Sequence, residues 1–245
     1  MKKIAFVGDS FSAYNQAGQY ENHWSWKLAQ QFPQYEYYNY AAGGRGVDYC
    51  QWCLLDAKRQ SVDIVFINRT HLARTSLLNG DADFEFNHEP LSTISGMRYS
   101  NLEVDNRHHM WYSAASDKYS TQHDNGGYWS AKDESHMGNA LRYKALSSTY
   151  QDHNMKWFDN VKNLYNFKHI IPLELMDDVA HQDIPNAFAL MAAAHNVDRR
   201  DDNALFNNGL TISPTDAHWS PKGNDWALEN YILSEENVNI LNMYV

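Results

Sequence analysis

Short apolar runs recur along the chain, and each one stops at a polar or glycine-containing break. Residues 4–7 (Ile-Ala-Phe-Val) end at a glycine, and residues 62–67 are apolar apart from one aspartate. An aromatic-rich run covers residues 35–40, and a run over residues 168–175 is interrupted by Pro172. Apolar runs of this length are typical of strands buried on both faces of a parallel sheet. We therefore predict four strands, the last one short because proline cannot join a sheet ladder.

Segments with apolar residues at helical spacing lie between these runs. In the first of them, Trp24 and Leu28 fall on one face, and Pro33 ends the pattern. Residues 198–210 are polar and are predicted to form a loop. Strands that alternate with helices predict an α/β fold, namely a three-layer, doubly wound parallel sheet with helices on both faces. The predicted helices cover residues 20–31, 47–58, 136–165, 183–195 and 221–233, the last beginning at Pro221.

Residues 80–135 break this alternation, because they are rich in polar residues and lack a clear period. They also carry many aromatic side chains, among them Trp111 and Trp129, which argues against disorder. We therefore predict one domain over residues 1–245, with a long aromatic-rich insertion over roughly residues 75–150 that shapes the substrate cleft. Four histidines of this segment, His108, His109, His123 and His136, are expected at the surface rather than in a metal site.

Charge and segment lengths narrow the possible partners and locations. The net charge is −10, so the chain is not expected to bind a nucleic-acid backbone. The N-terminal apolar run is too short for a secretory signal, and no segment approaches the length of a membrane span. A cytoplasmic location without a membrane partner is therefore the expectation, although a phage-encoded or specially exported protein would share these features.

The chain has two cysteines, in Cys50-Gln-Trp-Cys53. This spacing is that of a redox pair, but nothing around it resembles a thioredoxin-like unit, and a zinc site would need two more ligands. We interpret both cysteines as small apolar residues on a helix, and we expect neither a metal nor a cofactor.

Ser10 follows the first predicted strand, in Gly8-Asp9-Ser10. A hydroxyl at this position lies at the carboxyl edge of the sheet, where open α/β folds bind ligands. A helix beginning next would point its free N–H groups at the same place, which is the arrangement that a nucleophile for acyl transfer needs. The alternative is that Asp9, Ser10 or Ser12 only caps a helix.

Two further loops are expected at the same edge of the sheet. Residues 39–46 (Asn-Tyr-Ala-Ala-Gly-Gly-Arg-Gly) join a strand to a helix, and their glycines allow backbone N–H groups to face an anion. Asn68, Arg69, Thr70 and His71 form a polar cluster directly after a buried strand. Both loops therefore could contribute polar groups to a site beside Ser10.

Near the end of the chain, Asp216-Ala-His218-Trp219 precedes the helix that begins at Pro221. A carboxylate beside a histidine holds the imidazole in one tautomer and stabilises its protonated form. A loop at the sheet edge would let His218 reach Ser10, whereas the alternative is a surface turn without a function. The coincidence with Ser10, the glycine loop and Asn68 favours a serine-based active site.

In sequence and in order, these segments resemble the blocks of the SGNH (GDSL-type) hydrolases. Gly8-Asp9-Ser10-Phe11-Ser12 is similar to the first block, residues 39–46 to the second, and Asp216-Ala-His218-Trp219 to the last. Asn68 matches the third block by its position at a strand end, although Arg69 stands where that block usually has an aspartate. One residue rather than two separates Asp216 from His218, and this spacing resembles the SGNH-like branch that O-acetylates polysaccharides.

The resemblance implies a flavodoxin-like SGNH fold and a serine esterase that hydrolyses an acetyl or short-acyl ester, for example on a carbohydrate. Ser10 would be the nucleophile, His218 the general base and Asp216 the carboxylate that orients it. The oxyanion hole would consist of the Ser10 and Gly44 backbone N–H groups and the Asn68 side chain, with Gly46 as the alternative to Gly44.

Two alternative functions stay open at this point. The same serine could transfer an acyl group to an alcohol, as an O-acyltransferase does, or the fold could bind a carbohydrate without any chemistry. Arg45, Arg69 and His71 flank the predicted cleft, either as groups that bind an acidic substrate or as solvated loop charges. The expected partner is a small-molecule or carbohydrate ester.

Overall fold

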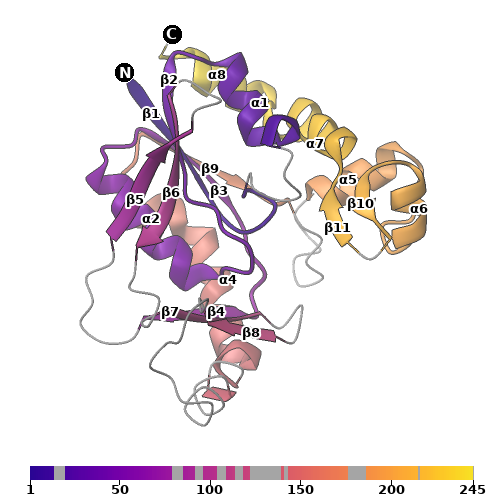
Figure 1. The fold of residues 1–245 in the computed structure, drawn as a ribbon, viewed down its shortest axis with the longest axis horizontal. Coiled ribbons are helices and arrows are strands. Elements are labelled where there is room, and N and C mark those ends of the chain that lie inside the picture. Colours follow the sequence, from indigo (N-terminus) through magenta and orange to yellow (C-terminus); the bar gives the residue numbers. More distant parts are fainter. Residues whose placement is uncertain are drawn as a thin grey trace.

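A six-stranded sheet in the order β5-β6-β2-β1-β3-β9 forms the centre of the computed structural model (Figure 1). The structure describes residues 1–13, 20–78, 85–91, 96–103, 109–113, 118–121, 139–140, 143–175, 186–214 and 216–244. The strands of this sheet are β1 (Lys2–Val7), β2 (Tyr35–Asn39), β3 (Ile64–Asn68), β5 (Glu85–Pro90), β6 (Met97–Glu103) and β9 (His169–Leu173).

Most neighbouring strands of the central sheet run parallel. β1 pairs in parallel with β2 on one side and β3 on the other, β6 is parallel to β2, and β9 is parallel to β3. β5 runs antiparallel to β6. The sheet grows from β1 first toward β2 and later toward β3, so the predicted doubly wound fold is confirmed. Pro172 lies in β9 at the edge of the sheet, which is where a strand accommodates proline.

Alternate residues of the strands pack against helices on opposite faces of the sheet. Ile4 and Phe6 of β1 point into a core shared with α1 (Trp24–Gln31), α5 (Ala187–Ala194) and α7 (Pro221–Ala227). Ala5 and Val7 point into a second core, shared with α2 (Val47–Arg59) and α4 (Ser148–Leu164). The sheet is therefore the middle of three layers, and each large apolar side chain buried there contributes about 1.5–3 kcal/mol to stability.

Cys50 and Cys53 belong to the second of these cores. Both lie wholly buried on the face of α2 that packs against the sheet, and they are not joined in a disulfide. Burial raises the pKa of both thiols well above the ordinary value. A thiol that stays protonated is a poor nucleophile, so the two residues behave as the small apolar core residues interpreted from the sequence.

The C-terminal part of the chain contains two helices that the sequence patterns did not predict. The expectation of a loop over residues 198–210 is wrong, because α6 (Asp202–Asn207) lies there, capped by the Asp201 carboxylate that accepts a hydrogen bond from Ala204 N–H at 2.9 Å. Leu205 is the residue that α6 buries, so the segment lacks an apolar period. The helix expected over residues 221–233 is α7, which passes into a π-helical turn, η4 (Leu228–Ile232), and α8 (Glu235–Asn242) follows.

Part of the predicted insertion belongs to the central sheet, since β5 and β6 lie within it and β6 pairs with β2. A separate three-stranded antiparallel sheet lies beyond the carboxyl ends of the parallel strands (Figure 1). Its strands are β4 (Arg74–Leu78), β7 (His109–Ser113) and β8 (Lys118–Thr121). His108, His123 and His136 lie outside the described residues. That the insertion shapes a substrate cleft stays a prediction.

Three short elements complete the frame around the candidate residues. A 3-10 turn, η2 (Tyr20–Asn22), precedes α1, and β10 (Thr211–Ser213) pairs antiparallel with β11 (Asp216–Trp219) just before α7. Within the described part of the chain, the helices are too short or too polar to cross a membrane.

Candidate active site

Ser10 stands in a tight turn that follows β1. The Ala13 N–H donates to the Asp9 carbonyl oxygen at 2.9 Å, which closes the turn. Gly8 precedes it with a φ of 153°, and a Cβ there would lie 2.8 Å from Asn68 Cβ, so a larger residue would not fit. The turn therefore holds Ser10 beside the end of β3, where the strand order of the sheet reverses.

A cavity of about 220 Å³ lies beside this turn. Ser10, which is 7% exposed, and His218 both line it, although they come from opposite ends of the chain. The fold thus brings together the two side chains that the sequence proposed as nucleophile and base. The lining is completed by Phe11, Asn22, His23, Thr211, Ile212, Trp219, Ser220, Pro221 and Asn224.

His218 and Asp216 are held together in β11. The imidazole Nδ1 lies 2.5 Å from Asp216 Oδ1, and the same oxygen accepts the His218 backbone N–H at 3.0 Å. Burial alone would raise the pKa of Asp216, but the hydrogen bonds and charge of His218 bring it below the ordinary value. His218 Nε2 is buried and has no hydrogen-bond partner among the described residues. An imidazole held at Nδ1 with Nε2 unoccupied is arranged to act as a base.

Phe11 joins the two halves of the site by packing. Its ring stacks on the His218 imidazole, with centroids 5.1 Å apart and an angle of 28° between the planes. It also meets the Trp219 ring edge-on at 5.5 Å. The residue that follows Ser10 therefore supports the imidazole, and sequence reasoning gave it no such role.

A buried network of charged and amide groups lies under the turn. Asp9 is wholly buried, and its Oδ1 accepts hydrogen bonds from Phe11 N–H at 3.1 Å and from Asn68 Nδ2 at 2.9 Å. Its Oδ2 lies 2.5 Å from Arg74 Nη1. Asn68 Oδ1 accepts the Leu175 N–H at 3.1 Å, so the Asn68 amide is held at both ends. The sequence did not single out Arg74, whose one signal is a charged residue at the start of an otherwise uncharged strand.

The glycine-containing loop packs against the same turn. Asn39 holds it, because Asn39 Oδ1 accepts the Ala41 N–H at 3.0 Å, and the Ala42 N–H donates to the Gly8 carbonyl oxygen at 3.2 Å. Gly44 adopts a φ of 74°, which favours glycine. The predicted oxyanion donors Gly44 and Asn68 are thus on segments that adjoin the turn, although neither is among the described residues that line the cavity.

The candidates for substrate binding make contacts within the protein. Arg69 forms ion pairs with Asp159, at 2.9 Å, and with Glu174. The Arg45 guanidinium lies 5.4 Å from the centre of the Tyr49 ring, and burial lowers its pKa to about 10.

His71 Nδ1 accepts the Ala73 N–H at 3.1 Å. Of the described residues, those that line the cavity include none of Arg45, Arg69 and His71. A role of these three residues in substrate binding stays a prediction.

A second histidine, His23, lies in the cavity wall. Its Nδ1 accepts the Ser25 N–H at 3.3 Å and lies 2.8 Å from Ser25 Oγ. Burial lowers the pKa of His23 to about 3, and this outweighs the opposite effect of a hydrogen bond to the Phe11 carbonyl. His23 is therefore neutral at physiological pH. The sequence patterns placed His23 inside the helix predicted over residues 20–31, whereas in the structure it caps α1, which begins at Trp24.

α1 and α7 tie the two ends of the chain together. The Trp24 indole N–H donates to the Phe11 carbonyl oxygen at 2.8 Å, and the Trp24 backbone N–H donates to Asn224 Oδ1 at 3.1 Å. Asn224 Nδ2 in turn donates to the Trp219 carbonyl oxygen at 3.1 Å. This brace fixes the segment that bears Ser10 relative to the segment that bears His218. Within the described residues, no group of three or more His, Cys, Asp or Glu side chains gathers to hold a metal ion.

Comparisons with known proteins add a likeness of overall structure. No protein-family model matches the chain, and no curated protein matches it. Among solved structures, it is similar to the crystal structure of a member of the lipolytic protein G-D-S-L family from Veillonella parvula DSM 2008. The two are 14% identical in sequence with a TM-score of 0.39, over 96% of this chain and 100% of that one.

Proposed function

We propose that this protein is a serine esterase of the SGNH type that hydrolyses an acetyl or other short-acyl ester. One observation carries the proposal: Ser10 and His218 line the same cavity, and His218 is held at Nδ1 by Asp216 while its Nε2 has no partner in the part of the chain that is described. A nucleophile, a base and a carboxylate that orients the base are the groups required for acyl transfer through a serine.

The proposed reaction has two halves. In the first, Ser10 Oγ attacks the ester carbonyl carbon while His218 Nε2 takes the hydroxyl proton, and the proton then passes to the alcohol oxygen as the ester C–O bond breaks. In the second, a water molecule attacks the acyl carbon while His218 Nε2 takes its proton. The bond from the acyl carbon to Ser10 Oγ then breaks, the acid leaves, and His218 returns the proton to Ser10 Oγ. The Ser10 and Gly44 N–H groups and the Asn68 amide would stabilise the oxyanion, each worth about 3 kcal/mol in the transition state.

The size of the cavity supports a short acyl group. A volume of about 220 Å³ is below the ~300–1,000 Å³ common for sites that enclose drug-sized ligands. Phe11, Ile212 and Trp219 give its wall an apolar and aromatic character. A small uncharged acyl chain would fit such a wall better than an ionised group, because burying an unpaired charge is strongly unfavourable.

An ester panel and a covalent probe test the proposal together. We expect the purified protein to hydrolyse p-nitrophenyl acetate faster than esters of long acyl chains, and a fluorophosphonate probe to label it at Ser10. Ser10→Ala should abolish both, with an unchanged circular dichroism spectrum. Full turnover in Ser10→Ala, or a wild-type protein that neither hydrolyses any ester nor reacts with the probe, would refute the proposal; the latter result would favour a carbohydrate-binding protein without chemistry.

The spacing of the last block supports one alternative within the same chemistry. Asp216 and His218 are separated by one residue, as in the SGNH-like proteins that O-acetylate polysaccharides. An O-acyltransferase would form the same acyl-serine and pass the acyl group to a sugar hydroxyl instead of water. Acetate release measured with and without a sugar acceptor distinguishes the two, since a transferase shows less free acetate and a new sugar ester when the acceptor is present.

A further inference from the structure

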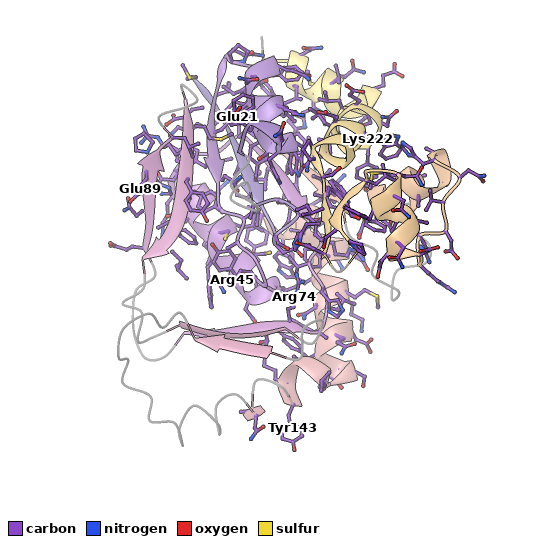
Figure 2. The ribbon with its side chains drawn as sticks, turned by 45° about the vertical axis from the view of Figure 1, so that its right-hand side comes forward. Glu21, Arg45, Arg74, Glu89, Tyr143 and Lys222 are labelled. Atoms are coloured by element: carbon purple, nitrogen blue, oxygen red, sulfur yellow. The ribbon has the colours of Figure 1, made fainter. Side chains whose placement is uncertain are left out.

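Arg74 is nearly buried, yet it belongs to the three-stranded sheet and not to the central one. It is the first residue of β4 and is 6% exposed. Figure 2 shows it on the side of the small sheet that faces the central sheet. From there its Nη1 reaches Asp9 Oδ2 at 2.5 Å, in the turn that bears Ser10. The Arg74 side chain therefore links the small sheet to the candidate active site.

The backbone of Arg74 is fixed from the opposite side by the glycine-containing loop. A Cβ at Gly46 would lie 2.4 Å from the Arg74 carbonyl oxygen, so the start of α2 can approach this closely only as glycine. The neighbouring Thr75 hydroxyl donates to Asp48 Oδ2 at 2.8 Å, and the Tyr150 hydroxyl donates to the same oxygen at 2.6 Å. Contacts from α2 and α4 thus hold the start of β4, where Arg74 lies.

Asp9 connects Arg74 to the Asn68 amide, because one of its carboxylate oxygens contacts Arg74 and the other contacts Asn68. Because Asp9 is wholly buried, its carboxylate needs a cation or several donors to remain charged, and Arg74 supplies the cation. The other carboxylate oxygen accepts one amide hydrogen of Asn68 and the Phe11 N–H. With one hydrogen directed at Asp9, the second amide hydrogen of the buried Asn68 has a defined direction.

We propose that Arg74 is a positioning residue that orients the Asn68 amide through Asp9 and so couples the three-stranded sheet to the oxyanion hole. The inference rests on the proposed function, because it concerns a donor of the proposed oxyanion hole. Arg74 lies between the turn of Ser10, the end of β3 and the glycine-containing loop, which are the segments that supply all the proposed donors. A donor that is fixed before the reaction stabilises the oxyanion far better than one that must reorient.

The experiment compares Arg74→Met and Arg74→Lys with a control, Arg98→Met, which removes an arginine whose Nε lies 2.7 Å from Glu36 in the central sheet. We measure kcat and KM for p-nitrophenyl acetate per folded protein, and the side-chain amide signals of Asn68 by ¹⁵N NMR, assigned with Asn68→Asp. Arg74→Met should lower kcat about 100-fold, the effect of losing one oxyanion donor, with KM nearly unchanged. Arg74→Lys should recover part of kcat and shift the Asn68 signals, whereas Arg98→Met should change neither.

The NMR measurement separates this inference from the proposed function. If Arg74→Met does not fold, Arg74→Lys, which keeps the charge next to Asp9, decides the question. Asn68 signals that are unchanged in Arg74→Lys, or an unchanged kcat in folded Arg74→Met, would overturn the inference. If the wild-type protein hydrolyses no ester but the Asn68 signals shift in Arg74→Lys, the proposed function fails while the positioning of Asn68 by Arg74 stands.

Discussion

A second Ser-His-Asp cluster lies inside the central sheet and can be compared with the candidate active site. Ser100 Oγ is 2.8 Å from His88 Nδ1, and the two residues face each other across the β5–β6 pair. His88 Nε2 lies 3.0 Å from Asp56 Oδ2, within the range of an ion pair although not aligned as a hydrogen bond. Asp56 Oδ2 also accepts the Tyr40 hydroxyl at 2.8 Å. By residue type and proximity alone, this cluster would pass for a catalytic triad.

The surroundings of the two clusters differ. Ser100 is 1% exposed, and both nitrogens of His88 face protein groups. Ser10 instead lines a cavity with His218, whose Nε2 meets no hydrogen-bond partner among the residues described. The first cluster ties an edge strand to α2, whereas the second leaves the proposed nucleophile and base beside a cavity. Access to a cavity, more than the three residue types or a nitrogen without a hydrogen bond, separates a reactive site from a structural one.

The sharpest test of this contrast replaces each histidine by glutamine. His218→Gln should lower kcat about a million-fold, because it removes the base proposed to activate Ser10. His88→Gln should leave kcat per folded protein within about twofold while lowering the melting temperature, since it breaks contacts between β5, β6 and α2. Kinetics and thermal melts on both variants give the comparison, and equal losses of kcat would remove the distinction between the two clusters.

Replacing the carboxylate of each cluster should show the same contrast as replacing the histidine, with a smaller loss of kcat. Asp216→Asn should reduce kcat about 10⁴-fold, because an amide no longer holds the His218 tautomer or stabilises its charge. Asp56→Asn should cost about 1–3 kcal/mol of unfolding free energy by disturbing the buried contacts of Tyr40 and His88, with little change in kcat. Urea unfolding and steady-state rates measure the two effects, and a catalytic loss in Asp56→Asn would contradict the assignment.

The burial of His23 in the cavity wall should make the stability of the protein depend on pH. Its pKa is about 3 in the folded protein and about 6.5 in the unfolded chain, so between these values the unfolded state binds more protons. Stability should therefore fall as the pH drops below about 6.5, by about 2–3 kcal/mol near pH 4.5 from this residue alone. His23→Gln should flatten that slope in urea unfolding at pH 7, 5.5 and 4.5, and an equally steep slope in the variant would contradict the burial effect.

The smallest expected effects are the changes in stability when the hydroxyl of Ser100 or of Ser10 is removed. Ser100→Ala should cost about 1 kcal/mol of stability, because His88 Nδ1 loses its partner, and should leave turnover unchanged. Ser10→Ala should leave the melting temperature almost unchanged, because the described residues give its hydroxyl no hydrogen bond, yet it should abolish turnover. Thermal melts of the two variants check this reversal, and a large stability loss in Ser10→Ala would show that the serine is structural.

Local patterns predicted the parts of the fold that rest on local interactions. The apolar run over residues 62–67 and the periodic segment over residues 47–58 became β3 and α2 with small shifts at their ends. β5 and β6 were not predicted, because their sequences contain few apolar residues and their place in the sheet depends on the pairing of β6 with β2, far away in the sequence. α6 buries chiefly Leu205, so its segment shows no apolar periodicity that would predict a helix.

The candidate site could be predicted where a reactive side chain follows a strand or where two such side chains are close in the sequence. Ser10 follows β1, and Asp216 stands two residues before His218, so both were visible in the sequence. Arg74, His23 and Asn224 were missed, because their roles come from burial and from contacts between distant segments. The ion pair of Arg74 with Asp9 depends on the small sheet folding back toward β1, and no local pattern contains that information.

The brace formed by Trp24 and Asn224 has a consequence for how the protein is made. The ribosome delivers the N-terminal segment first, and domains generally gain structure as their residues emerge. Here Ser10 leaves the ribosome well before His218 and Asn224. A nascent chain therefore carries the serine without its proposed base, and the candidate site is complete only when α7 docks onto α1.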